Sequence, residues 1–379
     1  MHILHVSSDF CNTKVYSNLY KSLSEHSIEQ TIYCPVRNRN QIGGNFFEAP
    51  GTNIIYDYVV KPYHRYLYHI KRSAIFQSLE KRINPASIDL CHASTLFTDG
   101  GQAYKIYKKY HIPYIVAVRN TDVNKFLKLL PNTWPAGRKI LLGASKIIFI
   151  SKALQDKFKS HWYIKSILPE IQGKMVCIPN GIDNFFLDNI YRQPHIGNKV
   201  LYIGDFSDNK NVARLCQAIL SLREEKGFGD ITLTLVGGGR SNGKIVDNLI
   251  TSNPNTFKYL GRIDDKDCLC KLMREHSLFA MPSIFETFGL VYVEALSQNL
   301  PIVYTLGQGI DGLFDRTVGV GVNPFSVDEI KNAIKTILTN RTFYSNNSVD
   351  FEVFRWKNIS RQYINSYRSI LNFLNNAKD

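Results

Sequence analysis

Short apolar runs alternate with longer amphipathic stretches along most of the chain. The residue pattern predicts that these runs are strands, and many of them are separated by a segment long enough for a helix. The predicted strands are HILHV, TIYCPV, NIIYDYVV, IDLCHA, YIVAV, KIIFI and KMVCI, then KVLYIG, ITLTLV, FKYLG, SLFAM, PIVYT and TVGVGV. This rhythm predicts an α/β protein with parallel sheets covered by helices.

The segment LDNIYRQPHIGNK (187–199) is the natural seam of the chain, because Pro, Gly and Asn interrupt regular structure. We expect one domain over residues 1–190 and a second over 196–358, since 379 residues suit two domains that each bury a core. Ligands of open α/β sheets bind at the carboxyl ends of the strands. Two such domains facing each other are therefore expected to form a cleft.

The composition is that of a globular protein, with 44% hydrophobic and 21% charged residues. No apolar run approaches the roughly 20 residues that span a bilayer, and the N-terminus MHILHVSSDF reads as a strand and not as a signal peptide. Seven scattered cysteines suit reduced thiols. We therefore expect a cytoplasmic protein.

The positive charge is concentrated in the first half of the chain. Residues 1–195 contain 25 Lys and Arg against 13 Asp and Glu, which accounts for +12 of the net +14. The segments KIYKKY (105–110) and NKFLKLLPNTWPAGRKILL (124–142) interleave these cations with aromatic and aliphatic residues. That mixture suits an anionic membrane surface or another anionic partner, although a plain solvated face remains an alternative.

One glycine-rich turn resembles a phosphate-binding P-loop without completing it. In LVGGGRSNGK, Gly238 and the pair Gly243 and Lys244 have the P-loop spacing, but Ile245 replaces the hydroxyl residue that would bind magnesium. A tight strand-to-helix turn beside a ligand is the favoured interpretation. Serine-triad and metal-ligand spacings are absent, so no metal site is expected.

The segment PSIFETFGLVYVEAL (282–296) keeps two carboxylates, Glu286 and Glu294, within an apolar frame. A helix beginning near Gly289 would leave the backbone N–H groups of Phe288, Gly289 and Leu290 free to bind a phosphate or a sugar hydroxyl. One carboxylate could then accept hydrogen bonds from sugar hydroxyls and the other from a ribose diol. For an isolated segment, a capping carboxylate and a surface carboxylate would be the default interpretation.

This segment resembles the signature of the family-four retaining glycosyltransferases of the GT-B fold, P-S-x-x-E-x-F-G-L-x-x-x-E-A. The resemblance extends over most of the chain, in the family's order. The matching segments are IPNGID, YIGDFSDNKN, LVGGG, YLGRI and FRWKNISRQYINSYRSIL. It implies two Rossmann-like domains facing across a cleft, the first completed by a C-terminal helix over 359–379.

The resemblance also implies the site residues. The catalytic residues would be Glu286, Arg119 and Asp122, with Glu286 positioning the donor sugar. The nucleotide-sugar would be bound by Lys210, Glu294, Phe288, Gly289, Leu290, Gly204, Gly238, Arg262 and Ile263. No metal is expected, because no carboxylate pair resembles D-x-D and Lys210 can neutralise the leaving diphosphate.

The chain departs from the family pattern at three places. SSDFCNTKVYSN lacks the glycine loop common after the first strand, and Asp205 replaces the arginine of G-R-x-x-x-x-K, although Lys210 remains. VRNTD puts Arg119 where many members have a histidine, while Asp122 keeps the position of the aspartate.

We expect a retaining transferase of hexosyl or N-acetylhexosaminyl type that uses a nucleotide-sugar, in the first instance a UDP-sugar, with a hydroxyl acceptor. The acceptor would be a glycan or a lipid-linked molecule in bacterial-type polysaccharide, glycolipid or glycoconjugate synthesis. No cofactor and no nucleic acid partner are expected, and the protein could lie peripherally on the inner face of the plasma membrane. Because of the three departures, a catalytically weak GT-B partner subunit is the alternative, and a nucleotide-sugar epimerase of similar fold is a further one.

Overall fold

The computed structural model describes residues 1–239, 243–344 and 348–376, which form two compact units. The first unit contains Met1–Ile150, Leu154–Gly181 and the C-terminal segment from Trp356. The second contains Ile182–Arg355 together with Ser151–Ala153. The second unit thus begins before the seam expected at 187–199, and the chain returns to the first unit at Trp356.

A seven-stranded sheet forms the centre of the first unit, with all strand pairs parallel and the order β3-β2-β1-β4-β5-β6-β7. Its strands are β1 (His2–Val6), β2 (Glu29–Pro35), β3 (Thr52–Asp57), β4 (Leu90–Ala93), β5 (Tyr114–Val118), β6 (Lys146–Phe149) and β7 (Met175–Cys177). Most of the central strands are fully buried, as expected for a parallel sheet covered on both faces.

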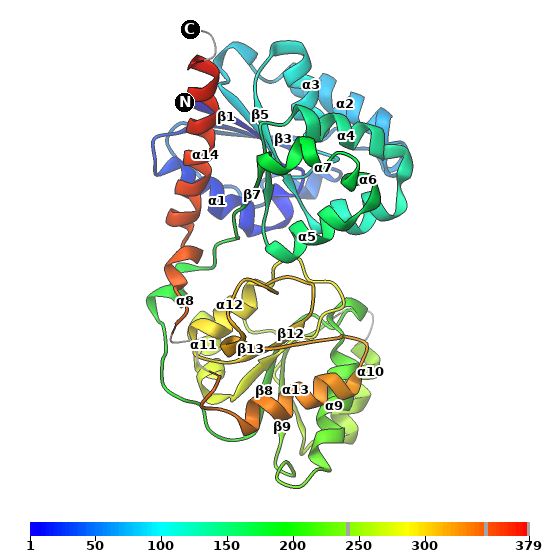
Figure 1. The fold of residues 1–379 in the computed structure, drawn as a ribbon, viewed down its shortest axis with the longest axis vertical. Helices are drawn as coiled ribbons and strands as arrows, with labels where there is room; N and C mark the ends of the chain where they lie inside the picture. The colour runs from blue at the N-terminus through cyan, green and yellow to red at the C-terminus, as the bar shows by residue number, and fades with distance from the viewer. Residues whose placement is uncertain (240–242, 345–347, 377–379) are drawn as a thin grey trace. The chain divides into compact units, whose positions relative to one another are not determined.

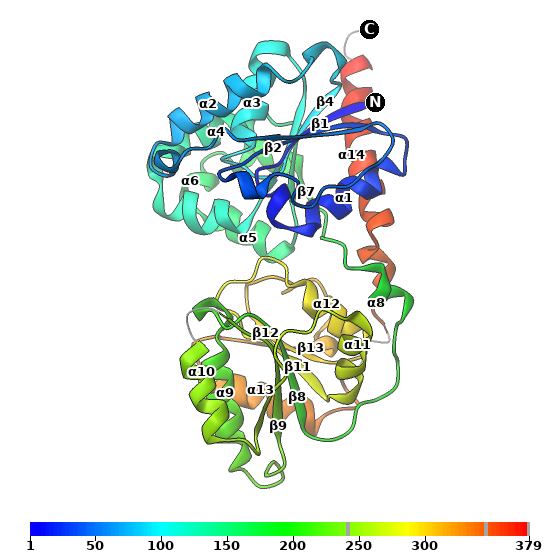
Figure 2. The same ribbon diagram turned by 180° about the vertical axis from the view of Figure 1, so that it is seen from behind.

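Seven helices between residues 14 and 171 lie on both faces of this sheet (Figures 1 and 2). They are α1 (Lys14–Ser24), α2 (Tyr68–Glu80), α3 (Gly100–Tyr110), α4 (Trp134–Gly143), α5 (Lys152–Ser160), α6 (Trp162–Lys165) and α7 (Leu168–Ile171). The C-terminal helix α14 (Trp356–Asn376) packs beside α1, where Ser22 and Ser360 are joined by a 3.0 Å hydrogen bond. The predicted end of this helix, residues 377–379, lies outside the described residues.

The second unit repeats this architecture with six parallel strands in the order β10-β9-β8-β11-β12-β13. The strands are β8 (Lys199–Gly204), β9 (Thr232–Gly237), β10 (Phe257–Tyr259), β11 (Leu278–Ala280), β12 (Ile302–Thr305) and β13 (Gly319–Val322). The helices are α8 (Asn184–Asp188), α9 (Val212–Arg223), α10 (Gly243–Ser252), α11 (Lys266–Glu275), α12 (Leu290–Ser297) and α13 (Val327–Thr339).

The predicted fold class is confirmed. Each predicted strand-like run contains a strand, and the strands form two parallel sheets of the Rossmann type. No helix in the described parts of the chain is both long and apolar enough to cross a membrane.

Candidate active site

Two loops meet at the carboxyl edge of the second sheet because they follow neighbouring strands. β8 leads into a 3₁₀ turn at Asp208–Lys210, and the adjacent strand β11 leads into residues 281–289. Asn209 joins the loops, because its side-chain amide donates to the carbonyl of Phe285 and accepts from the backbone N–H of Phe285, both at 2.9 Å. The backbone N–H of Ile284 also donates to the carbonyl of Asn209, at 2.8 Å. Two segments far apart in the sequence therefore form one rigid edge.

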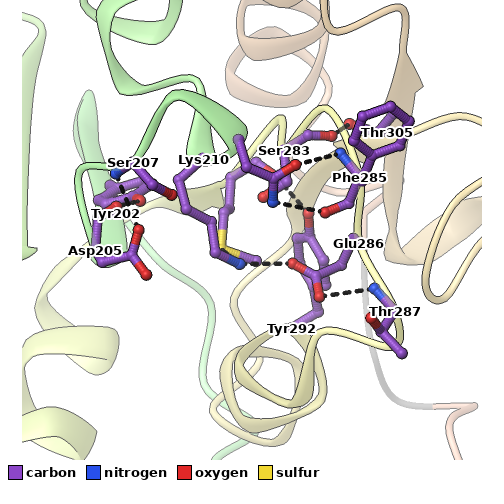
Figure 3. A network of polar contacts seen from close by, with 12 residues as sticks. Tyr202, Asp205, Ser207, Lys210, Ser283, Phe285, Glu286, Thr287, Tyr292 and Thr305 are labelled. Atoms are coloured by element: carbon purple, nitrogen blue, oxygen red, sulfur yellow. Dashed lines mark hydrogen bonds and ion pairs between the residues drawn. The ribbon is translucent and has the colours of Figure 1, made fainter. Parts of the chain in front are cut away.

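Lys210 and Glu286 form an ion pair across this edge (Figure 3). Lys210 Nζ lies 2.7 Å from Glu286 Oε2, and the two side chains are only 21% and 12% exposed. The other carboxylate oxygen, Oε1, accepts the backbone N–H of Thr287 at 3.0 Å. An ammonium carries three donor protons, so Lys210 can hold Glu286 and still donate to a bound anion. The pair therefore presents a fixed cation and a fixed acceptor at the end of β11.

Helix α12 begins at Leu290, as the pattern predicts, and Gly289 makes the turn into it. Gly289 has φ +78°, and a Cβ there would lie 2.4 Å from the ring of Tyr292 and 3.2 Å from Glu286 Cγ. The Tyr292 hydroxyl donates to the carbonyl of Met281, which holds the ring in place. Only glycine fits this turn. It sets the first backbone N–H groups of the helix, which lack intrahelical acceptors, beside Glu286.

Glu294 lies one turn inside α12 and is a carboxylate without a hydrogen-bond donor among the described residues. Burial raises the pKa of this carboxyl to about 7, and Asp183 raises it further while Lys266 opposes the rise. Lys266, the nearby cation, pairs with Asp183, so it opposes the rise in the pKa of Glu294 without neutralising its charge. A partly buried carboxylate left without a donor costs stability, and such a cost is typical of a group that binds a ligand.

Glycine turns bring the ends of β8, β9 and β10 together at the same edge. The backbone N–H of Gly238 donates to the carbonyl of Gly204 at 3.3 Å, and that of Gly237 donates to Gly261 at 2.7 Å. A Cβ at Gly237 would lie 1.9 Å from the Gly204 carbonyl oxygen. The predicted nucleotide-binding glycines Gly204 and Gly238 are therefore adjacent.

The remaining residues predicted to bind the nucleotide are less enclosed. Arg262 follows the edge strand β10, is mostly exposed, and pairs with Asp264 at 2.9 Å, while Ile263 beside it is partly buried. In the P-loop-like segment, Gly243 and Lys244 begin α10, and Arg240–Asn242 between the glycines lie outside the described residues.

Asp122 organises the loops at the carboxyl edge of the first sheet. Its carboxylate accepts three backbone N–H groups, from Leu96 at 3.1 Å, Phe97 at 3.2 Å and Arg119 at 2.8 Å. The residue is 1% exposed, and burial raises the pKa of its carboxyl to about 6 against the opposing effect of these donors. It also begins a π-helix over Asp122–Leu127, an irregularity often found at functional sites.

Arg119 directly follows β5. Its Nε donates to the carbonyl of Ser94 at 3.1 Å, and its guanidinium lies 5.5 Å from the centre of the Tyr16 ring. The C-terminal helix brings Tyr363 close to the same guanidinium. Arg119 contacts Asp122 through its backbone N–H, whereas its guanidinium is held by Ser94 and the tyrosines.

Two polar residues at these edges were not singled out from the sequence. Asp99 is fully buried, accepts hydrogen bonds from Ser8 and from the Thr95 hydroxyl (3.0 Å), and burial raises the pKa of its carboxyl to about 7. Asn209 joins the two loops of the second unit. Asn209 lies in the polar run after β8, and that position is the signal that could have identified it. Asp99 lies six residues after β4, beyond the apolar pair Leu96 and Phe97, and carries no such signal.

In the described part of the chain, no group of three His, Cys, Asp or Glu side chains is placed to hold a metal ion. Asp122 instead accepts backbone N–H groups, Asp99 accepts hydroxyl groups, and Glu286 pairs with Lys210. The arrangement offers fixed cations, helix N–H groups and acceptors, which are the groups needed to bind an anionic, hydroxyl-rich molecule.

Two Rossmann-like units with parallel sheets are the architecture of the GT-B fold. Family models match both units: "Glycosyltransferase Family 4" over residues 13–184 and "Glycosyl transferases group 1" over residues 197–340. The chain belongs to this glycosyltransferase family.

Relatives and a solved structure agree with the family. The chain is 26% identical over 285 residues to an uncharacterized glycosyltransferase of Methanocaldococcus jannaschii, covering 73% of this chain and 74% of that protein. It is 25% identical over 272 residues to a putative teichuronic acid biosynthesis glycosyltransferase of Bacillus subtilis, covering 69% and 64% of the two chains. The crystal structure of Anabaena HepE in complex with UDP superposes with a TM-score of 0.71 at 18% identity, covering 97% of this chain and all of that chain.

Proposed function

We propose that this glycosyltransferase moves a hexosyl or N-acetylhexosaminyl group from a UDP-sugar to a hydroxyl acceptor with retention of configuration. The proposal rests on the different environments of the two glutamates, Glu286 and Glu294. Glu286 is held by Lys210 beside the start of α12, whereas Glu294 is partly buried and has no donor among the described residues. A nucleoside diphosphate carries an anion that can bind beside Lys210 and Glu286, and a ribose hydroxyl pair that can bind to Glu294.

The donor would occupy the edge of the second unit. Lys210 and the first N–H groups of α12, from Phe288 to Leu290, would bind the diphosphate, and Glu294 would accept hydrogen bonds from the ribose. Glu286 would orient the donor sugar. The complex of HepE with UDP supports UDP as the nucleotide, since that protein shares the fold.

Departure of the diphosphate creates an oxocarbenium-like sugar and negative charge on the leaving group. Lys210 and the N-terminus of α12 would stabilise that charge at positions fixed before the reaction. These groups supply the electrostatic stabilisation without a metal ion, so we propose a metal-independent reaction.

In the first unit, Arg119 would bind an anionic group of the donor or acceptor, because a guanidinium stays protonated and donates several hydrogen bonds. Asp122 would act as a positioning residue, since both of its oxygens already accept backbone N–H groups. The acceptor would be a glycan or a lipid-linked molecule. The similarity to a putative teichuronic acid biosynthesis glycosyltransferase supports an acceptor in polysaccharide synthesis. We also propose that the protein lies peripherally on the inner face of the plasma membrane.

UDP release from a panel of UDP-sugars, with and without EDTA, tests the proposal. Release that depends on the sugar and that is lost in Glu286→Ala is the expected result, with anomeric retention measured by NMR on the product. UDP binding without release from any nucleotide-sugar, combined with activation of a second glycosyltransferase, would instead identify a partner subunit. Interconversion of two nucleotide-sugars without an acceptor would identify an epimerase.

A further inference from the structure

An exposed, tyrosine-rich segment leaves the carboxyl edge of the first sheet. It follows β3 and extends from Tyr58 to Ile70, and we refer to it as the tyrosine segment. Five of its large hydrophobic side chains are exposed, by 40% to 79% of their surface. They are Tyr58, Tyr63, Tyr66, Leu67 and Ile70. So many exposed apolar side chains within 13 residues indicate an interaction surface and not scattered surface residues.

The segment is held firmly although its apolar side chains face outward. Residues Pro62–Arg65 form a 3₁₀ turn, in which the buried His64 accepts the backbone N–H of Lys61 at its Nδ1 (3.1 Å). Tyr68, the first residue of α2, donates from its hydroxyl to the carbonyl of Phe97 at 2.8 Å. These inward anchors fix the outward orientation of the residues between them.

The charge of the segment has a single sign. Residues 58–79 contain four Lys and Arg and no Asp or Glu. The cations lie against the exposed rings, with Lys61 Nζ 4.2 Å from the centre of the Tyr58 ring and the Arg65 guanidinium 5.9 Å from that of Tyr66. Arg39, from the loop after β2, lies 5.9 Å from Tyr58 as well. Two exposed rings of the segment, those of Tyr58 and Tyr66, therefore lie beside cations.

The two basic runs that the sequence suggested for membrane binding differ from the tyrosine segment in what they expose. In residues 105–110 and 124–142 most of the aliphatic side chains face inward, because Ile106, Leu127, Ile140 and Leu141 are at most 1% exposed. These runs expose their cations without a matching apolar surface, apart from Leu129. The apolar and basic residues coincide in the tyrosine segment instead.

We propose that the tyrosine segment docks the first unit on an anionic lipid bilayer. Tyrosine suits the bilayer interface, where its ring meets the apolar region and its hydroxyl stays hydrated. Leu67 and Ile70 can enter the acyl boundary while Lys61 and Arg65 meet anionic headgroups. The absence of acidic residues between 58 and 79 removes the charges that such a surface would repel.

This inference rests on the proposed function, because it says which residues would hold the enzyme at the membrane. It can be tested by lipid binding alone, without the transfer reaction. The tyrosine segment and Arg119 both follow strands of the first sheet at its carboxyl edge. Docking through the segment would therefore bring the edge that carries Arg119, which we propose binds an anionic group of the donor or acceptor, close to the lipid.

Cosedimentation of the full chain with vesicles tests the proposal, comparing neutral phosphatidylcholine with mixtures containing about a third phosphatidylglycerol. We expect binding to the anionic vesicles that weakens as salt rises, because a surface charge is screened over about 10 Å at 0.1 M salt. Leu67→Ser with Ile70→Ser should lower the partition coefficient about tenfold. Lys61→Gln with Arg65→Gln should lower it about 25-fold, since each cation near such a surface contributes about 1 kcal/mol, or about fivefold.

The matched control is Ile196→Ser with Phe343→Ser, which removes two exposed apolar side chains from the second unit and should leave lipid binding unchanged. Unchanged thermal unfolding shows that each variant is folded, and UDP affinity without vesicles reports on the donor site independently. Equal binding to neutral and anionic vesicles, no binding at all, or equal losses in the tyrosine-segment and control variants would overturn the proposal. A wild-type dimer that the Leu67 and Ile70 substitutions dissociate, without vesicle binding, would overturn it in favour of a protein interface.

Discussion

Replacing Glu294 by glutamine should stabilise the folded protein and weaken nucleotide binding at the same time. The carboxyl is partly buried and accepts no hydrogen bond from the described residues, and burial raises its pKa to about 7 from an ordinary value of 4.5. The folded state therefore disfavours the ionised form. Glutamine has nearly the same shape and no charge to desolvate, so the substitution removes this cost.

The magnitude follows from the rise in pKa. A folded pKa above the unfolded one gives a contribution to stability that is complete below pH 4.5 and is lost as the pH rises through about 7. At 1.36 kcal/mol per pKa unit, the loss reaches about 3 kcal/mol at pH 8 and is about 1 kcal/mol at pH 5. Glu294→Gln should thus gain about 3 kcal/mol over the wild type at pH 8 and about 1 kcal/mol at pH 5.

Two measurements check both halves of this prediction. Urea unfolding at pH 5 and pH 8 gives the difference in the free energy of unfolding, with the wild type as reference. Calorimetric titration at pH 8 gives the nucleotide affinity. The loss of charge-assisted hydrogen bonds to the ribose should weaken UDP binding about 10-fold to 100-fold. The wild type should also prefer UDP to 2′-deoxy-UDP, and the variant should lose that preference.

A stability difference independent of pH would refute the assigned cause, which is desolvation of an ionised carboxylate. A variant that kept the wild-type preference for UDP over 2′-deoxy-UDP would refute the contact with the ribose. If both results were found together, Glu294 would be an ordinary helix residue.

Further substitutions separate the roles of the other site residues. Glu286→Ala should lower turnover more than UDP affinity, and Lys210→Ala should weaken UDP binding about tenfold or more; equal small effects of both would contradict their assignment. Arg119→Lys should retain measurable turnover as a point charge, whereas Arg119→Ala should lose much more; wild-type turnover and donor affinity in the alanine variant would show that the guanidinium only shapes its loop. Asp122→Ala should lower the free energy of unfolding by about 2–3 kcal/mol, because three buried backbone N–H groups lose their acceptor, and an unchanged urea midpoint would argue against that role. EDTA should leave transfer unchanged; loss of transfer that magnesium or manganese restores would show that a metal replaces Lys210.

The strands and the glutamate frame could be predicted because their information is local. Each of the 13 strands lies within a short apolar run, and period and length suffice to recognise such runs in a parallel sheet. The start of α12 follows from the same kind of signal, since Gly289 is the residue type that a left-handed turn before an apolar helix requires. The order of the matching segments was enough to predict two Rossmann-like units.

The sequence could not show how the site residues are engaged, because those contacts join distant segments. Lys210 meets Glu286 only because β8 and β11 are neighbours in the sheet, and Asp122 reaches Leu96 only because β4 lies beside β5. Strand order depends on the packing of the whole unit, and no local pattern records it.

The exposure of side chains and the pKa of Glu294 could not be predicted from the sequence for the same reason. The basic runs at 105–110 and 124–142 and the tyrosine segment have similar compositions, yet the helices of the first unit bury most aliphatic side chains of the former and leave those of the latter outside. Likewise, the sequence placed Glu294 in a binding frame, but only the surrounding protein raises the pKa of its carboxyl. Desolvation is the sum of many neighbours, most of them far away along the chain, and it exists only once they are packed together.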